Sequence, residues 1–436
     1  MGAGPCVHRD KATTGFACCT AETRKGDQDV DKKTLENLRL QVEVLRRRNA
    51  ALEAAGAGKK DYVNTGLPTT IRPSFAAKAL PVAATAPSLS VQERSRLLQE
   101  ATAEAIASLP LPIALLFPNQ TPGLAGSLVP ATVTRVPGAI RMLREAADIT
   151  GSDLQEIAGI HGKTHQKSDA PRLGQPLVFV ASCIAIERLR YERPEAVHRC
   201  QAVAGIGVGE FAALYAADVL DFDLGLRLVM LRAEQMQRAA SAAGPELMQL
   251  SITGMSLERV QALCEQVRRT LGDDEVASVA YSVGAQAHIC SGTKQGVEEL
   301  RKLIEAQARA GARASVLPSP EHLRCGAFQT KLMEEAQRQL RKALLDALPK
   351  LRPPRCAVYF NVMGEAVPAG AQPSLIVQLL ADQITSTVRW EQTVRTMLRE
   401  GIEELVVCGP PGASQMKEVI EDIAPEAANR TTLCSA

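Results

Sequence analysis

The sequence has few aromatic residues and almost no net charge. Tryptophan, tyrosine and phenylalanine make up 3% of the 436 residues, and 50 basic residues against 48 acidic ones leave a formal charge of +2. Proteins that bind nucleic acid usually carry a basic surface, and those that bind single strands add aromatic stacking platforms. These two shortages argue against a nucleic-acid partner.

Membrane and secretion signals are also lacking. No run of 18 uncharged apolar residues exists, so no segment is expected to span a membrane. Arg9, Asp10 and Lys11 interrupt the N-terminus before an apolar core forms, which disfavours a secretory signal. Gly2 begins an acylation-like pattern, but Cys6 stands where the myristoylation motif asks for Ser or Thr.

The 11 cysteines show no C-x-x-C spacing. Cys183, Cys264, Cys290 and Cys408 lie singly inside apolar runs, where a thiol behaves as a small core residue. This usage favours an intracellular reducing compartment over a disulfide scaffold, and it does not distinguish cytoplasm from plastid or mitochondrion.

Metal-ligand spacing is absent among the histidines. His161, His165, His198 and His288 form no ligand pattern with one another, so we interpret them as surface or core residues. The sequence therefore predicts no metal site and no cofactor.

The first quarter of the chain is expected to lie outside the main folded domain. Residues 1–30 are polar and without periodicity, which predicts a disordered tail. The heptad spacing of apolar residues in 31–56 predicts a short coiled-coil helix. Residues 57–90 are rich in Ala, Thr, Pro and Ser, as linkers are. Ser90 and Glu93 have the spacing of a capping box, so residues 91–110 are expected to form a leading helix.

The predicted coil has an apolar seam with heptad spacing. Its members are Leu35, Leu38, Val42, Leu45, Asn49 and Leu52. An Asn at an a position commonly specifies a paired, in-register coil, and this seam would then hold a partner helix. An amphipathic helix lying on its own domain fits three heptads equally well.

The remainder alternates short apolar runs with amphipathic helices, which indicates an α/β fold with a largely parallel sheet. Residues 113–117, 202–205, 358–361 and 404–408 are its expected strands. They belong to a large domain over 111–245 and 318–436.

A second pattern, over residues 246–317, interrupts this domain. Its expected order is strand 247–252, helix 257–271, strands 276–282 and 287–291, helix 295–310 and strand 314–317. The order βαββαβ is that of a ferredoxin-like unit, so a small domain is predicted to be inserted into the larger one.

A glycine-dense turn, Ala204-Gly205-Ile206-Gly207-Val208-Gly209-Glu210-Phe211-Ala212-Ala213-Leu214, joins a predicted strand to a helix. Such a junction is where a nucleophile elbow lies. The segment resembles the G-H-S-x-G-E-(Y/F)-A-A-L elbow of malonyl-CoA:acyl carrier protein transacylases. Ile206 and Gly207 stand in place of that family's His and catalytic Ser.

Further segments resemble the same family in the same order. Leu116-Phe117-Pro118-Asn119-Gln120-Thr121 is similar to F-P-G-Q-G, whose Gln helps to form the oxyanion hole, and Gln175-Pro176 precedes an expected helix. Met230-Leu231-Arg232-Ala233 resembles the helix whose Arg holds the malonyl carboxylate, and Asn361-Val362 resembles a later landmark. The resemblance implies an α/β-hydrolase-like large domain, with Gln120, the Val208 N–H, Arg232 and Asn361 as oxyanion or substrate-binding candidates.

Cys325-Gly326-Ala327-Phe328-Gln329-Thr330 is similar to the segment that carries the family's general-base His, and Gln329 takes its place. A glutamine amide does not accept a proton at neutral pH. With Gly207 and Gln329 at the two catalytic positions, no catalytic residue is intact.

We therefore expect a pseudoenzyme that binds malonyl-CoA, an acyl thioester or acyl carrier protein. Two alternatives remain open. One is an active S-malonyltransferase of fatty acid or polyketide synthesis that uses unconventional groups, with His322 or Cys325 as a relocated nucleophile. The other is a structural subunit of a larger assembly.

Overall fold

The computed structural model describes residues 110–120, 136–151, 171–244, 246–318, 326–410 and 413–435, all within the compact unit Ser95–Ala436. The expected tail, coiled-coil helix, linker and nearly all of the leading helix lie outside these residues. The predictions made for residues 1–109 therefore stay predictions.

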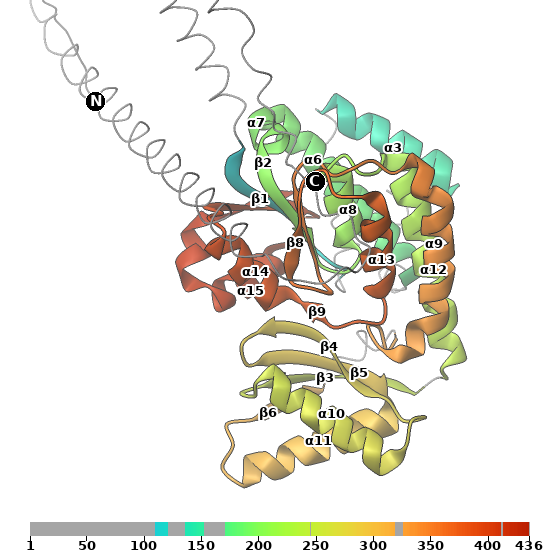
Figure 1. Cartoon of the computed structure of the whole chain (residues 1–436), viewed down its shortest axis with the longest axis vertical. Helices are drawn as coiled ribbons and strands as arrows, with labels where there is room; N and C mark the ends of the chain where they lie inside the picture. Colours follow the sequence, from blue (N-terminus) through green and yellow to red (C-terminus); the bar gives the residue numbers. More distant parts are fainter. Residues whose placement is uncertain are drawn as a thin grey trace, which may run out of the picture. The chain divides into compact units, whose positions relative to one another are not determined.

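A six-stranded sheet forms the centre of the larger part (Figure 1). Its order is β11 (Thr431–Ser435), β10 (Glu404–Gly409), β1 (Leu111–Phe117), β2 (Cys200–Gly205), β7 (Ala357–Phe360) and β8 (Glu365–Val367). All neighbours are parallel except the antiparallel pair of β7 and β8. The four expected strands are confirmed as β1, β2, β7 and β10, while the edge strands β8 and β11 were not predicted.

Helices cover both faces of this sheet, which makes it an α/β fold (Figure 1). Among the described residues, the helices of the larger part are α3 (Pro137–Thr150), α6 (Pro171–Glu192), α7 (Pro194–His198), α8 (Gly209–Ala216), α9 (Phe222–Ala242), α12 (Glu334–Ala347), α13 (Pro373–Asp382), α14 (Trp390–Arg399) and α15 (Ser414–Ile423). Short 3₁₀ turns lie at Lys331–Met333, Leu348–Lys350 and Pro425–Arg430.

The two cores follow the alternation of side chains along β1. Leu115 and Phe117 belong to the cluster under α6, α8 and α9, and Ala114 and Leu116 belong to the cluster under α14 and α15. Both faces of the strand are therefore buried, which explains the continuous apolar run in the sequence.

Gln175-Pro176 does not precede a helix, so that expectation was wrong. The pair lies inside α6, which begins at Pro171. Pro176 is the sixth residue of α6, beyond the first turn, so its lack of an N–H removes one i→i−4 hydrogen bond from the helix. None of the helices that the structure describes is long and apolar enough to cross a bilayer.

The second sheet is built from the interrupting segment. Its chain order is β3 (Leu247–Thr253), α10 (Leu257–Leu271), β4 (Ala277–Gly284), β5 (Ala287–Thr293), α11 (Lys294–Arg309) and β6 (Ser315–Pro318). The strand order is β6-β3-β5-β4-β9, with α10 and α11 packed on one face (Figure 1). The short strand β9 (Val388–Arg389) comes from the later part of the chain and runs parallel to β4, so it joins the two parts.

Candidate functional site

The strand-to-helix turn between β2 and α8 is too tight for side chains at two of its glycines. A Cβ on Gly205 would lie 2.0 Å from the carbonyl carbon of Gly209, and a Cβ on Gly209 would lie 2.3 Å from the carbonyl oxygen of Phe117. Gly207 sits at the apex with φ +56°, in the left-handed region. The turn therefore has the tight strand-to-helix form of a nucleophile elbow, with a glycine at its apex.

Asn361, which follows β7, holds this elbow in place. Its Oδ1 accepts from the Gly207 N–H at 2.9 Å, and its Nδ2 donates to the Gly205 carbonyl at 2.6 Å. Both ends of the fully buried amide are thus committed to the turn. The geometry gives Asn361 a positioning role beside the substrate-binding role suggested by the sequence.

Asn119, at the end of β1, reaches the apex from the other side. Its Oδ1 accepts from the Val208 N–H at 3.4 Å, and its Nδ2 donates to the hydroxyl oxygen of Tyr281 at 3.1 Å. Burial raises the pKa of Tyr281, opposed by the charge of Arg232, so the phenol stays protonated at neutral pH. Gln120, the half-buried oxyanion candidate, is the next residue in the chain.

Glu210, in the first turn of α8, is fully buried behind the elbow. One carboxylate oxygen accepts from the Asn361 N–H at 2.6 Å, and the other accepts from Gln383 Nε2 at 2.7 Å. Burial raises the pKa of Glu210 to about 8, and these hydrogen bonds together with the charge of Arg232 oppose the rise.

Arg232, on α9, is a buried cation with 1% of its surface exposed. Its Nη1 donates to Gln175 Oε1, its Nη2 donates to Gln383 Oε1 at 2.8 Å, and its Nε has no hydrogen-bond partner. Burial lowers the pKa of Arg232 to about 10, opposed by Tyr281 and Glu210. Within the described part of the chain it forms no ion pair, so its planar fork lacks the carboxylate that such a group binds best.

Gln383, just after α13, connects these groups, and the sequence analysis missed it. Its Oε1 accepts from Arg232, and its Nε2 donates both to the Gly207 carbonyl at 2.5 Å and to Glu210. A lone glutamine at the end of a helix carries no local pattern that marks it as part of a site. Asn119 was missed as well, although its signal was present: the family motif has Gly at that place.

The network brings together five of the residues that the sequence indicated, from three separate segments of the chain, and adds Asn119 after β1 and Gln383 after α13. The five are Gly207, Val208, Glu210, Arg232 and Asn361. Because these segments meet at the carboxyl ends of β1, β2 and β7, the arrangement is that of an α/β active-site crevice.

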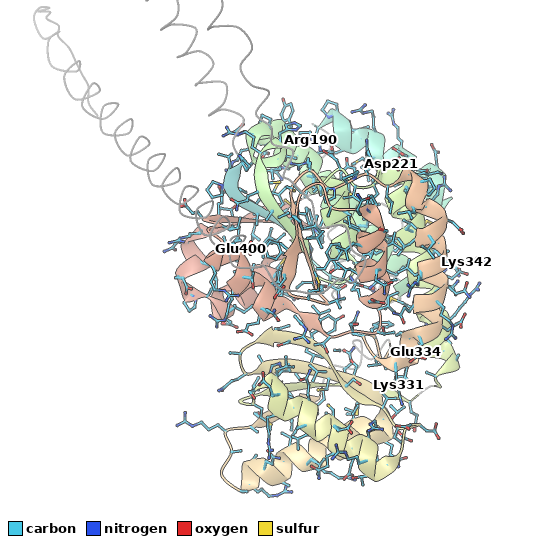
Figure 2. The ribbon with its side chains drawn as sticks, in the orientation of Figure 1. Arg190, Asp221, Lys331, Glu334, Lys342 and Glu400 are labelled. Atoms are coloured by element: carbon cyan, nitrogen blue, oxygen red, sulfur yellow. The ribbon has the colours of Figure 1, made fainter. Side chains whose placement is uncertain are left out.

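Gln329 lies outside this hydrogen-bonded network. It is 2% exposed, has φ +57°, and its Oε1 has no partner among the described residues. It lines a cavity of about 460 Å³ between α10, the start of β4 and residues 385–387. Lys331, labelled in Figure 2, lines the same cavity. His322 and Cys325, the alternative nucleophiles, lie outside the described residues.

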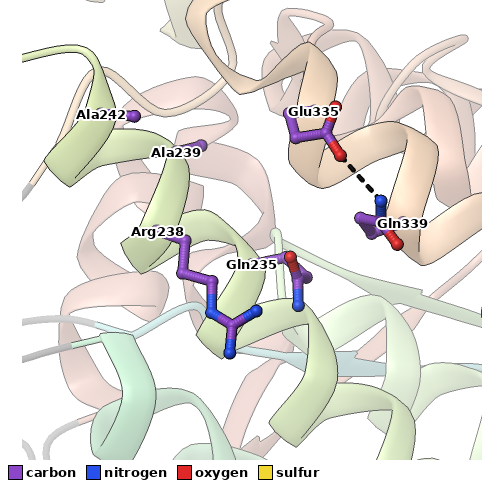
Figure 3. A pocket seen from close by; sticks show the side chains of 6 residues that line it. All are labelled: Gln235, Arg238, Ala239, Ala242, Glu335 and Gln339. Carbon is purple, nitrogen blue, oxygen red and sulfur yellow. Dashed lines mark hydrogen bonds between the residues drawn. The ribbon is translucent and has the colours of Figure 1, made fainter.

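Two other hollows contain none of the predicted site residues. One of about 380 Å³, between α9 and α12, is lined by Gln235, Arg238, Ala239, Ala242, Glu335 and Gln339 (Figure 3). One of about 730 Å³ lies between the N-terminus of α10 and α14. No three His, Cys, Asp or Glu side chains of the described segments are grouped to hold a metal ion.

Comparison of the sequence with known proteins identifies relatives of this chain. No family model matches the sequence. The human mitochondrial malonyl-CoA-acyl carrier protein transacylase is 33% identical over 287 residues, covering 65% of this chain and 69% of that protein. The mouse mitochondrial transacylase is 33% identical over 319 residues, covering 71% and 79%.

Solved structures agree on the fold. A malonyl-transacylase solved with the holo acyl-carrier protein of a type II PKS superposes with a TM-score of 0.61 at 24% identity, covering 74% of this chain and 94% of that one. Fold and site thus define an α/β acyltransferase-like protein. The chain belongs to the malonyl-CoA-acyl carrier protein transacylase family, as the sequence motifs predicted.

Proposed function

We propose that this chain is a non-catalytic member of its family, which binds a malonyl-type thioester and does not transfer the acyl group. The observation that carries the proposal is Gly207 at the apex of the elbow. Acyl transfer of this kind passes through a covalent ester on a side-chain nucleophile, and glycine has no atom to acylate.

The second catalytic position supports the same proposal. Gln329, in the place of the family's base, offers an amide that does not take up a proton at neutral pH. Removing a nucleophile from such a site typically leaves only about 10³ to 10⁴ of rate enhancement over water, supplied by binding and the oxyanion hole. Losing the base as well adds little, so both positions are free to change once transfer is no longer selected.

Arg232 supports retained binding. A buried guanidinium with a partnerless Nε, two glutamine partners and no ion pair within the described chain is suited to a ligand carboxylate. A malonyl group carries such a carboxylate, whereas an acetyl group does not. We assign the Val208 N–H and Gln120 to the neighbourhood of the thioester carbonyl.

The relatives support a proposal for the partner and the compartment. The human and mouse proteins are named for malonyl-CoA and acyl carrier protein and as mitochondrial, and one structural neighbour is solved with a carrier protein. We propose malonyl-CoA or a malonylated carrier protein as ligand and the mitochondrion as location. A coiled-coil partner for residues 31–56 remains a prediction.

We also propose the domain division of the sequence analysis for this chain. The inserted part over 246–317 is assigned as a ferredoxin-like subdomain, supported by the element order βαββαβ and the strand order β6-β3-β5-β4. Residues 111–245 and 318–436 then form the large domain.

The test is calorimetric titration of the purified protein with malonyl-CoA, acetyl-CoA and holo carrier protein, with the same samples assayed for acyl transfer by mass spectrometry. Binding of malonyl-CoA in preference to acetyl-CoA, without transfer, is the expected result. Transfer above background would overturn the proposal, and so would equal affinity for both thioesters, because the carboxylate would then have no role.

A further inference from the structure

The side chain of Asn119 occupies space that a nucleophile would need. A Cβ built on Gly207 would lie 2.5 Å from Asn119 Oδ1 and 2.9 Å from its Cγ. Real Cβ atoms essentially never approach a heavy atom below 3.0 Å. Any side chain at position 207 therefore requires Asn119 to move.

The Asn119 amide also accepts a hydrogen bond from a backbone N–H of the elbow. Asn119 Oδ1 accepts from the Val208 N–H at 3.4 Å, which is long compared with the usual 2.9–3.0 Å for such a bond. Its other end donates to Tyr281 on β4, so the amide joins the end of β1 to the second sheet. Two neutral hydrogen bonds, one of them stretched, hold it there.

We propose that Asn119 fills the acyl position of the elbow and sets which ligands the site accepts. An amide oxygen and a thioester carbonyl oxygen are both acceptors, so they compete for the single Val208 N–H. A carboxylate at Arg232 uses different donors, which Asn119 does not contact: Nε has no partner, and the two Nη atoms donate to Gln175 and Gln383. The site would thus accept a free carboxylate readily, and an acyl carbonyl only after Asn119 has been displaced.

This inference deepens the proposed function and rests on it only for the ligand. The contact itself concerns two residues of the chain, Asn119 and Gly207, 88 positions apart, and can be tested without any ligand. Two experiments therefore test separately the position of Asn119 at the elbow and the binding of a malonyl ligand.

The first experiment is a double-mutant cycle on thermal unfolding with Gly207→Ala, Asn119→Gly and their combination. Gly151→Ala serves as the control, because Gly151 has φ +65° and nothing within 4 Å of a built Cβ. We expect Gly207→Ala to lower the melting temperature more than Gly151→Ala, and Asn119→Gly to remove most of the excess. An equal loss from Gly207→Ala with either residue at position 119 would overturn the inference.

The second experiment compares affinities of the wild type and Asn119→Gly for free malonate and for malonyl-CoA. Asn119→Gly should bind malonyl-CoA about threefold to tenfold more tightly, the worth of one neutral hydrogen bond, with malonate affinity unchanged. Asn119→Ala, which keeps the backbone restricted, should give the same change. Unchanged malonyl-CoA affinity in both variants would overturn the inference.

A failure of the proposed function would give a different result from a failure of this inference. If neither the wild type nor Asn119→Gly binds malonate or malonyl-CoA, the binding role proposed for Arg232 is wrong. The mutant cycle would still decide whether Asn119 occupies the elbow.

Discussion

Gln383 Oε1 accepts a hydrogen bond of 2.8 Å from Arg232 Nη2, although the two residues are 151 positions apart. The other end of the same amide donates to the Gly207 carbonyl and to Glu210. A single glutamine thus connects the buried cation of α9 to the apex of the elbow. The turn whose apex is Gly207 is therefore held by side chains from two other segments of the chain, those of Asn361 and Gln383.

The Gln383→Ala substitution should lower the free energy of unfolding by about 1–3 kcal/mol or more, because it leaves buried polar groups without partners. Urea denaturation measures the change. Gln339→Ala is the matched control, since the Gln339 amide binds Glu335 on an exposed helix face. A loss no larger than that of the control would show that the network does not hold the site together.

Glu210 should make stability depend on pH. Because burial raises its folded-state pKa from 4.5 to about 8, its contribution to stability is complete below pH 4.5 and is lost as the pH rises towards 8. The slope from one such proton is at most about 1.4 kcal/mol per pH unit. Unfolding measured between pH 4.5 and 8 should show this decline in the wild type and a flatter curve for Glu210→Gln, while Glu234→Gln should leave the decline unchanged.

Restoring chemistry should require three substitutions at once. In Gly207→Ser alone, the new side chain meets Asn119 and no base is present, so incubation with malonyl-CoA should leave the protein mass unchanged. Asn119→Gly, Gly207→Ser and Gln329→His together should give a malonyl-protein adduct: the serine oxygen bonds to the carbonyl carbon, the imidazole takes its proton, and CoA leaves as the thiol. Intact-mass spectrometry distinguishes the two results, and an adduct on the single variant would contradict the role of Asn119.

Arg232→Lys should weaken malonate binding by about tenfold or more, because a point charge replaces a planar fork that binds a carboxylate through two parallel bonds. Isothermal titration with free malonate is the measurement. Arg227→Lys on the same helix is the control, since Arg227 is an exposed residue paired with Asp223. Equal malonate affinities of Arg232→Lys and Arg227→Lys would show that Arg232 does not bind the carboxylate.

The sequence by itself determined the α/β alternation, the four central strands and the family to which the chain belongs. Each of these is a local property: a buried parallel strand such as β1 is a continuous apolar run, and the family motifs are short runs of neighbouring residues. The strands β8 and β9 escaped prediction because runs of three and two residues carry no periodic signal. β11 (Thr431–Ser435) has exposed residues at its centre and lacks the continuous apolar run of the central strands.

Only the tertiary structure decided what surrounds the elbow. The contacts of Asn119 with Val208 and Tyr281 span 89 and 162 positions, and that of Gln383 with Gly207 spans 176. Hydrogen bonds between such distant residues leave no spacing in the sequence. Asn119 meets Val208 because the parallel strands β1 and β2 place their carboxyl ends at one edge of a sheet, whereas Tyr281 comes from the second sheet and Gln383 from the end of α13.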